Sequence, residues 1–460
     1  MLNDYFEQMK FSERIMNTLR EVLPSPFSLA VILTVLTFIL ALFLTSPNPE
    51  IAQPHAFQLF GYWYGGLWKL LEFAMQMMVM LVLGHVLALS KPFNWLMDKA
   101  VLPCTSGPLA AFWVTLIAVC FALFNWGLGL IIGALFARKV AEHAQKKMIP
   151  INFPLIGACG YAGLMVWHGG LSGSAPLKVA QQKHMFAHLT NGEAISISET
   201  ILSPMNLAAI IACLVILPLA MSLLARSLPS AVPNIKPRKT NSAKNVQKIG
   251  LAEKLDFSPI FAKIFGSFLL FGFLYVFWIE PGKLDISKID PNLINLFFLS
   301  LALLFHRNIR EFLSATEEAI LGSTGIMLQF PLYAGIMGIM AGSGLITVFS
   351  EMMVEISGPE SFFIFTLISA SVVNFFVPSG GGQWVIQGEI VLTASNSLGV
   401  PQPKAVMALA YGDQLTNMMQ PFWALPLLAI TGLRAGQIMP YTLFLMLLGS
   451  LIFSSVLMIF

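Results

Sequence analysis

Long apolar runs separated by short polar stretches extend over the whole of this chain. Runs such as Phe27–Thr45 and Thr200–Leu224 carry no charged residue. Each is long enough to cross a hydrocarbon layer of ~30 Å as a helix, whereas a membrane β-barrel would need strands of ~10 residues with alternating polarity. The pattern predicts an all-α polytopic membrane protein with full spans at 27–45, 71–90, 152–168, 200–224, 259–279, 290–305, 317–342, 404–420 and 440–460.

Two further apolar segments, 109–141 and 361–399, are too long for one span, and each breaks near its middle. We interpret both as re-entrant or broken helical hairpins that enter and leave on one side. Two full spans for each segment are the alternative. Shorter amphipathic pieces at 57–70, 93–101 and 345–357 suit the membrane interface.

The same order of segments occurs twice. Span, span, hairpin, span and span fill residues 27–224 and again 290–460, with one connecting span at 259–279 between them. Each half crosses the membrane an even number of times, so the connecting span turns the second half upside down. The sequence therefore predicts two inverted-topology repeats whose hairpin tips meet near the midplane, as in many secondary transporters.

Charge predicts the orientation. Hydrophobic residues make up 57% of the 460 residues, charged residues make up only 11%, and the net charge is +3. With the amino terminus in the cytoplasm, 20 of the 26 Lys and Arg residues fall inside, which fits the positive-inside rule. We expect an amphipathic cytoplasmic segment at 1–26, a basic cytoplasmic linker at 225–258 and a periplasmic carboxyl terminus.

A helix-breaking motif marks the middle of each predicted hairpin. The first reads Asn125-Trp126-Gly127-Leu128-Gly129, and the second runs from Asn374 through Pro378-Ser379-Gly380-Gly381-Gly382-Gln383. Flanking residues repeat too: Gln76 and Gln329 precede the two Asn residues by 49 and 45 positions, and Tyr161 and Tyr411 follow them by 36 and 37. Duplicated, interrupted helices of this kind indicate a substrate site between repeats.

The second motif has the composition of an anion site. Pro378 disfavours continuation of the preceding helix, the glycines permit a close turn, and the helix restarting at Gln383 offers free N–H groups. A flexible kink for packing is the alternative. For the first motif, close helix packing through Gly129 is the alternative. Asn125 and Asn374 could hold a carboxylate, a coupling cation or each other.

A dense polar stretch interrupts the span at 404–420. It offers Tyr411 and Gln414 as candidate substrate ligands, and Asp413 and Asn417 as candidates for ion coupling. A charge inside the membrane is costly, and burial disfavours the ionised form of a carboxyl group. Asp413 is therefore the best candidate for a proton or cation site. A neutral Asp413 that hydrogen-bonds to Asn or Tyr for packing is the alternative.

The first half offers a counterpart in Tyr161 and in the Gly/Ser run that contains Ser172 and Ser174. This run is expected to unwind a helix, and its hydroxyl groups could complete the substrate site. His168 reads as a proton relay or as a bystander at the end of a span. Glu389 reads as a pocket residue or as an interface residue.

No Arg or Lys lies near the middle of any expected span. The charge of an anionic substrate would then be met by helix amino termini, amide side chains and a co-transported cation, which predicts coupling to H⁺ or Na⁺. No metal site or other cofactor is expected, since the four cysteines are scattered. His-Glu-x-x-His, Gly-x-Ser-x-Gly and Walker A motifs are missing, which argues against an enzyme or an ATP-driven pump. A passive channel is the remaining alternative.

Several motifs together resemble the bacterial short-chain fatty acid transporter family. They are Asn125-Trp-Gly-Leu-Gly-Leu, Gln329-Phe-Pro-Leu-Tyr-Ala-Gly335, Val377-Pro-Ser-Gly-Gly-Gly-Gln-Trp-Val-Ile-Gln-Gly388, Ala410-Tyr-Gly-Asp-Gln414 and Gln420-Pro-Phe-Trp-Ala-Leu-Pro426. The resemblance implies an inner-membrane carrier for short carboxylates such as acetoacetate or butyrate, with inverted halves, re-entrant hairpins and alternating access. Its partners would be the carboxylate and the lipid bilayer, with no nucleic acid; homo-oligomerisation is left open.

Overall fold

The computed structural model describes residues 26–181, 184–235, 253–282, 291–377 and 380–460. The amphipathic segment at 1–26 apart from its last residue, the middle of the basic linker, and Pro378 and Ser379 therefore lie outside the described residues. The described part is helical and contains no strand; its β-type pairing is a single bridge between Ile151 and Ala231. Six of its helices are long and apolar enough to cross a membrane, so the all-α polytopic class is confirmed.

The first half of the chain contains ten α-helices and short connecting turns of 3-10 helix between them within the described residues. They are α2 (Pro26–Leu44), α3 (His55–Leu67), α4 (Leu71–Leu89), α5 (Lys91–Ala100), α6 (Gly107–Phe124), α7 (Trp126–Lys147), α8 (Phe153–Tyr161), η1 (Ala162–Met165), η2 (Trp167–Gly169), α9 (Ser174–Val179), η3 (Ala187–Leu189), α10 (Pro204–Ser227) and, after the linker, α11 (Glu253–Asp256).

The remaining elements begin with the connecting span and continue through the second half. They are α12 (Pro259–Leu274), η4 (Tyr275–Ile279), α13 (Pro291–Phe305), α14 (Ile309–Ala319), η6 (Ile320–Ser323), α15 (Thr324–Gly342), α16 (Leu345–Glu355), α17 (Phe362–Phe376), α18 (Gly380–Leu398), α19 (Gln402–Thr416), η7 (Asn417–Met419), α20 (Pro421–Thr431) and α21 (Ala435–Ile459).

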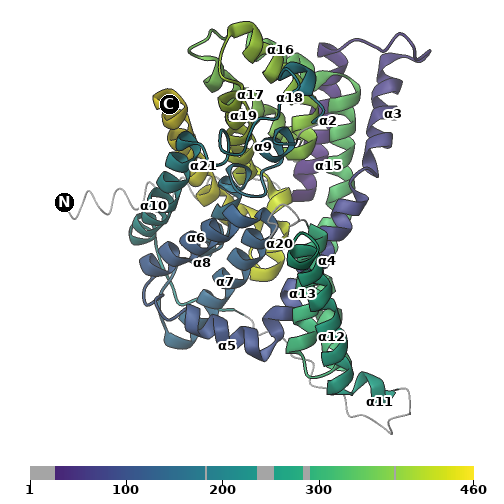
Figure 1. Ribbon diagram of the computed structural model, residues 1–460. Helices are drawn as coiled ribbons and strands as arrows, with labels where there is room; N and C mark the ends of the chain where they lie inside the picture. The colour runs from purple at the N-terminus through teal and green to yellow at the C-terminus, as the bar shows by residue number, and fades with distance from the viewer. Residues whose placement is uncertain (1–25, 182–183, 236–252, 283–290, 378–379) are drawn as a thin grey trace, which may run out of the picture.

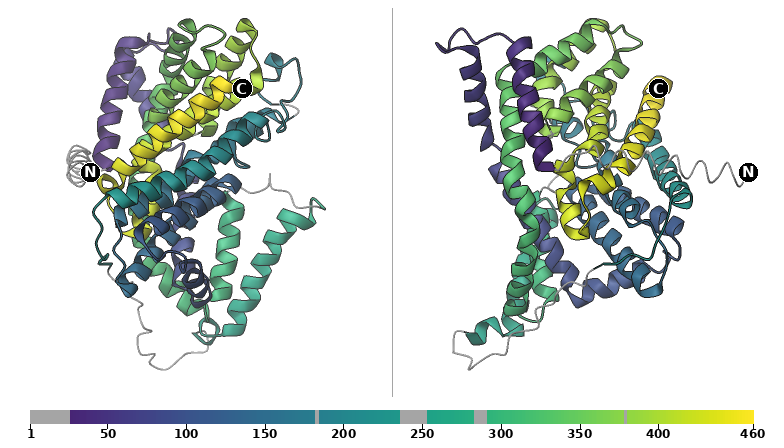
Figure 2. Two further views of the ribbon diagram at one scale, coloured as in Figure 1. Left: turned by 90° about the vertical axis from the view of Figure 1, so that its left-hand side faces the viewer. Right: turned by 180° about the vertical axis from the view of Figure 1, so that it is seen from behind.

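The hairpins of the two halves lie toward opposite ends of the molecule (Figure 1). Figure 1 shows α6, α7 and α8 in its lower part and α17, α18 and α19 in its upper part. Each half has a helical hairpin, α6–α7 or α17–α18, followed by a helix that breaks at mid-height, α8–η1–η2–α9 or α19–η7–α20. Each then ends in one long helix, and these two, α10 and α21, pack against each other (Figure 2, left).

Asn125 breaks the first hairpin by capping α7. Its backbone is extended, and its Oδ1 accepts hydrogen bonds from the backbone N–H groups of Gly127 (2.9 Å) and Leu128 (3.2 Å). Asn is a favoured residue at this position because its side chain satisfies N–H groups that a new helix leaves unpaired. Gly129 then lets α7 turn back against α6, since a Cβ there would lie 2.5 Å from the Cα of Ala122.

In the second hairpin, two glutamines hold α18 against α17. Gln383 Nε2 donates to the carbonyl oxygen of Ala370 at 2.9 Å, and Gln387 Nε2 donates to Ser369 Oγ at 2.8 Å. The amide groups thus replace the polar partners that water would supply, as buried polar groups require. Asn374 lies two residues before the end of α17 and is fully buried.

A second group of helices, α2, α3, α4, α12, α13 and α15, lies beside the hairpins (Figure 1, right side). Here one expectation was wrong: the piece at 57–70 does not form a separate interfacial helix. It is α3, which packs along α15, because Gly66 and Gly338 allow the two backbones to touch. Small residues permit close approach of this kind between membrane helices.

Gly66→Ala is expected to destabilise the protein, whereas Gly65→Ala is expected to leave it unchanged or slightly more stable. A Cβ at Gly66 would lie 2.6 Å from the carbonyl oxygen of Ala334, but a Cβ at Gly65 meets nothing within 4 Å. Overpacking costs about 1–3 kcal/mol. Thermal unfolding of the two purified variants in detergent checks the prediction, and equal melting temperatures would contradict it.

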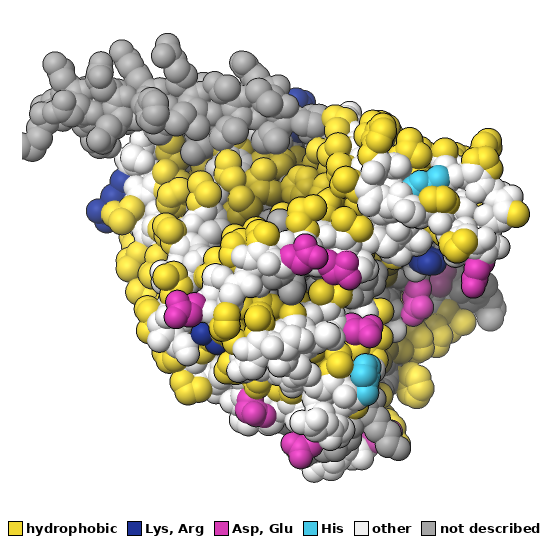
Figure 3. Space-filling model, turned by 90° about the horizontal axis from the view of Figure 1, so that it is seen from above, with side chains coloured by type: hydrophobic (Ala, Val, Ile, Leu, Met, Phe, Trp, Pro, Cys, Tyr) yellow, Lys and Arg dark blue, Asp and Glu magenta, His cyan; other side chains and the backbone are white. Residues whose placement is uncertain are grey.

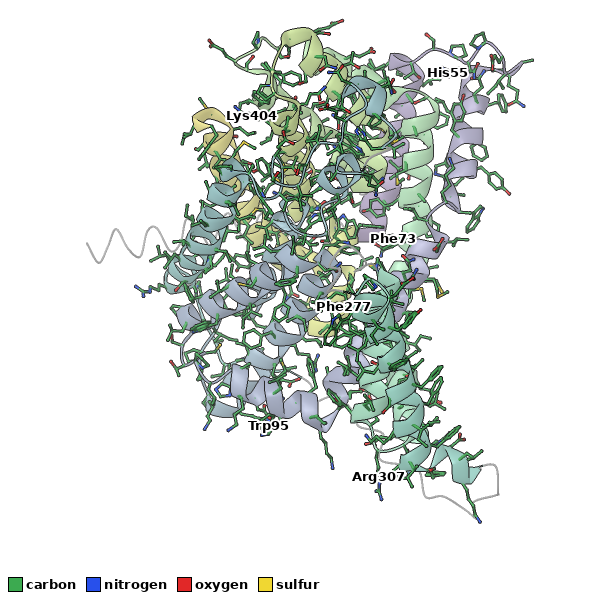
Figure 4. All side chains as sticks on the ribbon, viewed as in Figure 1. His55, Phe73, Trp95, Phe277, Arg307 and Lys404 are labelled. Atoms are coloured by element: carbon green, nitrogen blue, oxygen red, sulfur yellow. The ribbon has the colours of Figure 1, made fainter. Side chains whose placement is uncertain are left out.

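Charged side chains lie at both ends of the molecule (Figure 4). Trp95 on α5 and Arg307 lie at the lower end, while His55 and Lys404 lie at the upper end (Figure 4). Exposed Lys91 and Lys99 flank Trp95 on α5. From above, more acidic than basic side chains are visible (Figure 3). The exposed apolar face of α12, with Ile260, Ile264, Phe268 and Phe271, is suited to contact with lipid.

Candidate functional site

The two hairpin tips are joined through the segment that follows η2, which is irregular up to Gly173 and then forms α9. Next to the first tip, Leu171 N donates to the carbonyl oxygen of Leu123 at 2.7 Å, and Ser172 Oγ accepts from Trp126 N at 3.1 Å. Next to the second tip, Lys178 Nζ donates to the carbonyl oxygen of Gly381 at 3.2 Å. The segment from Leu171 to Lys178 therefore contacts both tips.

The broken helix of the second half, α19–η7–α20, holds Asn374. The Asn374 side-chain nitrogen donates to the carbonyl oxygen of Asp413 (2.6 Å) and to Asn417 Oδ1 (2.9 Å). Gln420 Nε2 in turn donates to the carbonyl oxygen of Asn374. The end of α17 and the break after α19 are therefore fixed to each other by buried polar contacts.

Asp413 and His168 form a buried pair at the centre of this region. Asp413 Oδ2 lies 2.8 Å from His168 Nδ1, and the two side chains are 1% and 0% exposed. Neither carboxylate oxygen has a well-aligned hydrogen-bond donor, because the ring is not directed squarely at either one. A buried carboxyl group with unused acceptor capacity is costly in its charged form.

The other ring nitrogen of His168 determines its tautomer. His168 Nε2 accepts a hydrogen bond from the backbone N–H of Ala175 at 3.0 Å. A ring nitrogen that accepts a hydrogen bond carries no hydrogen, so the ring is neutral and its proton is on Nδ1, facing Asp413. Protonation of Nε2 would displace Ala175, which lies at the start of α9.

Glycine is required where α18 begins. A Cβ at Gly380 would lie 2.6 Å from Asp413 Oδ2, and 2.8 Å both from His168 Cε1 and from Trp167 Cη2. The carboxyl group of Asp413 therefore lies directly beside the amino end of α18. The positive end of a helix dipole favours negative charge there.

Tyr411 and Gln414 hold η2 in place. Gln414 Oε1 accepts from the backbone N–H groups of His168 (3.0 Å) and Gly169 (3.3 Å). Tyr411 donates to Asn206 Oδ1 at 2.9 Å, and Asn206 Nδ2 donates to the Gly169 carbonyl at 2.8 Å. Irregular backbone inside a membrane protein needs such partners.

Tyr161 also connects two elements by a buried hydrogen bond, here α8 and η7. Its hydroxyl group donates to the carbonyl oxygen of Asn417 at 2.7 Å, across the two halves of the chain. Asn417 thereby receives one contact from α17 and one from the end of α8. The hydroxyl groups of Tyr161 and Tyr411 and the Oε1 of Gln414 are therefore engaged with the protein itself, and contact of these residues with substrate stays a prediction.

Aromatic rings surround the first tip. The Trp126 ring lies 5.1 Å from that of Trp423, 6.3 Å from that of Trp167 and 5.9 Å from that of Phe73. These rings come from α7, α20, η2 and α4. Phe73 lies at mid-height of the molecule (Figure 4). Trp167 also stacks on His168 at 4.4 Å, so the ring cluster adjoins the Asp413–His168 pair.

The other predicted residues lie in or near this region, with some exceptions. Gly127 lies beside Asn125, Gly382 is in the first turn of α18, and Ser174 lies near Gly381. Asn125 caps α7, and the structure places no hydrogen bond between it and Asn374 among the described residues. Ser379 lies outside the described residues.

Three flanking residues differ in their exposure. Glu389 is exposed on α18, so the interface reading fits its position better than the pocket reading. Gln76 is partly exposed, and its side chain contacts Glu72 on its own helix at 3.4 Å. Gln329 is buried on α15, and its Oε1 has no hydrogen-bond partner among the described residues.

The sequence analysis missed five residues of this region: Lys178, Trp167, Asn206, Gln420 and Trp423. Lys178 was assigned to an outer loop by its charge alone. Trp167 and Trp423 each lie beside the polar break of their half, at the Gly/Ser run and at the Tyr411–Gln420 stretch. An aromatic residue beside both breaks is a signal that could have identified them.

Comparison with known proteins finds relatives over nearly the whole chain. The family model for the short chain fatty acid transporter matches residues 8–460. The "Putative short-chain fatty acid transporter" of Escherichia coli (strain K12) is 36% identical over 94% of this chain and 95% of its own length. Its namesake from Haemophilus influenzae is 34% identical over 93% and 94%.

Among solved structures, the YdaH transporter of Alcanivorax borkumensis aligns with 94% of this chain and 98% of its own, at 15% identity and a TM-score of 0.42. MtrF of Neisseria gonorrhoeae aligns with 96% of both chains, at 13% identity and a TM-score of 0.36. Both TM-scores are low, so the fold is described from the contacts of this chain alone. Because the family model and both relatives span nearly the whole sequence, this multi-pass membrane protein belongs to the short chain fatty acid transporter family.

Proposed function

We propose that this protein is a secondary active transporter that carries small monocarboxylates, such as acetoacetate and butyrate, across the bacterial inner membrane by symport with H⁺ or Na⁺. Family membership supports the substrate class. The observation that carries the coupling is the buried Asp413–His168 pair beside the amino end of α18. An ionisable group held at this depth is expensive and is typically part of an ion pathway.

Charge explains why a cation would be needed. With His168 neutral, an ionised Asp413 contributes one negative charge to the centre, and a bound carboxylate would add a second. Taking charges out of water costs several kcal/mol each unless they are paired. A proton on Asp413, or a Na⁺ beside it, would remove one of these charges and allow the substrate to bind.

The arrangement of the helices supports alternating access. The two hairpins approach the centre from opposite ends, and we propose that both are re-entrant in the membrane (Figure 1). The carboxyl terminus, just after α21, lies at the upper end, where few basic side chains are visible from above, and this supports a periplasmic carboxyl terminus (Figures 1 and 3). Repeats of opposite orientation around one central site are typical of carriers that expose the site to one side at a time.

Uptake by proteoliposomes tests the proposal. Labelled acetoacetate and butyrate should accumulate when an inward H⁺ or Na⁺ gradient is imposed, and only with the gradient of the coupling ion. Undiminished accumulation after both gradients are collapsed would refute symport. Counterflow driven by unlabelled substrate should persist without any gradient, which a passive channel would not show.

A further inference from the structure

Three hydrogen-bond donors near the first hairpin tip are buried and have no acceptor within the part of the chain that the structure describes. They are the indole N–H of Trp167, the indole N–H of Trp423 and the hydroxyl group of Tyr333, on side chains that are 5%, 7% and 2% exposed. A buried donor that lacks a partner costs about 1–3 kcal/mol. Three such donors in one region require an explanation.

The three donors belong to one cluster of rings. Trp126 contacts both Trp167 and Trp423, at ring distances of 6.3 and 5.1 Å. The Tyr333 ring lies 4.9 Å from that of Phe422, which in turn lies 5.2 Å from that of Trp423. The donors therefore come from η2, α20 and α15, three parts of the fold that these ring contacts connect.

The region around Asp413, next to this cluster, contains buried acceptors that lack donors. Asp413 Oδ1, the Oδ1 of Asn374 and the Oε1 of Gln420 are buried acceptors without a donor among the described residues, and Asp413 Oδ2 has only His168 Nδ1 nearby, at 2.8 Å and poorly aligned. The two amide nitrogens are assigned securely, because each donates to a backbone carbonyl group. His168 stacks on Trp167, so the ring cluster with its unpaired donors lies next to the region around Asp413 with its unpaired acceptors.

We propose that the substrate carboxylate binds in the ring cluster, where the N–H groups of Trp167 and Trp423 and the hydroxyl group of Tyr333 donate to its oxygens. A carboxylate is the ligand that fits, because it accepts hydrogen bonds and donates none. The alkyl chain packs against Trp126, whose ring is only partly buried. This inference rests on the proposed function and adds to it a position for the anion, beside the group that takes the cation.

The cluster also accounts for a preference for short chains. Phe73 packs on Trp126 and on Trp423 at 5.9 Å each, so rings cover Trp126 from α4 as well as from α20. Each CH₂ group buried against such rings contributes about 0.8 kcal/mol, but only while it finds room. A smaller side chain at Trp126 would provide room for more CH₂ groups.

Other buried indole N–H groups in the described part of the chain lie outside the cluster. Trp63 packs against Gly335 at the α3–α15 contact, and Trp384 packs against Phe186. Neither lies in a group of several unpaired donors that share ring contacts. Trp63 is therefore a matched control, with a buried N–H and no ring contact to Trp126.

The experiment removes each donor without changing the shape of its side chain. Trp167, Trp423 and, as the control, Trp63 are each replaced by 3-benzothienylalanine, which has sulfur in place of N–H, and Tyr333→Phe removes the hydroxyl group. Binding of labelled butyrate to the purified protein is measured in detergent, at low pH and high Na⁺, so that the coupling site is filled whichever cation it takes. Without a gradient, this measurement is independent of symport.

Each cluster variant should bind butyrate roughly tenfold more weakly or worse, because a hydrogen bond to a charged group is lost, while the Trp63 variant binds as wild type does. Unchanged binding in all three cluster variants would overturn the proposal, and so would equal weakening in the Trp63 variant. Trp126→Ala should raise the affinity for hexanoate relative to butyrate; an unchanged ratio would remove Trp126 from the site. If the cluster variants bind butyrate more weakly as expected but uptake does not depend on the ion gradients, the proposal of symport is wrong and the proposed binding site is still supported.

Discussion

Asp413→Asn is expected to reduce concentrative uptake of short carboxylates to the level of protein-free liposomes. An amide cannot take up a proton or carry a negative charge, so the cation would lose its partner at the centre of the protein. Folding should be preserved, because Asn has the same shape and still presents an oxygen to His168 Nδ1, which lies 2.8 Å from Asp413 Oδ2. Uptake under an imposed gradient, together with the melting temperature, measures both effects.

Glu389→Gln provides the matched control. It makes the same change from carboxylate to amide, but at an exposed position on α18. Uptake by this variant should equal that of wild type. Accumulation at the wild-type level by Asp413→Asn would show that Asp413 is not part of the coupling, whatever the control does.

Gly380→Ala is expected to lose most of its transport activity, while Gly381→Ala keeps it. The added methyl group at Gly380 would lie 2.6 Å from Asp413 Oδ2 and 2.8 Å from His168 Cε1, so the buried pair or the start of α18 must move. At Gly381, the nearest atom is the flexible Lys178 Nζ, at 3.4 Å. Overpacking a buried site costs about 1–3 kcal/mol, and a displaced Asp413 would impair coupling as well.

The two glycines are adjacent in the first turn of α18, so helix propensity changes equally in both variants. The initial rate of butyrate uptake and the melting temperature should both fall for Gly380→Ala and remain near wild type for Gly381→Ala. Equal behaviour of the two variants would mean that the contact between Gly380 and Asp413 does not constrain the site.

Much of the fold could be predicted from the sequence because a bilayer imposes a length on every span. The apolar runs gave the helices, and the breaks at Asn125 and before Gly380 followed from side-chain capping and from glycine. The course of α3 could not be predicted in this way. Its amphipathic pattern suits an interface, but the sequence does not reveal that Gly66 lies opposite Gly338 on α15.

The site could be predicted only in part, for a related reason. The polar stretch around Asp413 was recognisable because such residues are rare inside membranes, yet its partner His168 lies 245 positions earlier in the chain. The position of a residue along a helix such as α19 does not reveal whether its side chain faces the first half of the chain. Gln414 therefore read as a substrate ligand, although its side-chain oxygen accepts two hydrogen bonds from the backbone around His168.

The stretch from Leu171 to Lys178 has a consequence for leakage. Its first residue is bonded to the end of α6 and its last to the start of α18. If either tip withdrew, this stretch would have to follow it or break its bonds at one end. Simultaneous opening of the centre to both sides would break the bonds at both ends, which makes free passage of ions through the protein costly and protects the gradient from which the cell draws its energy.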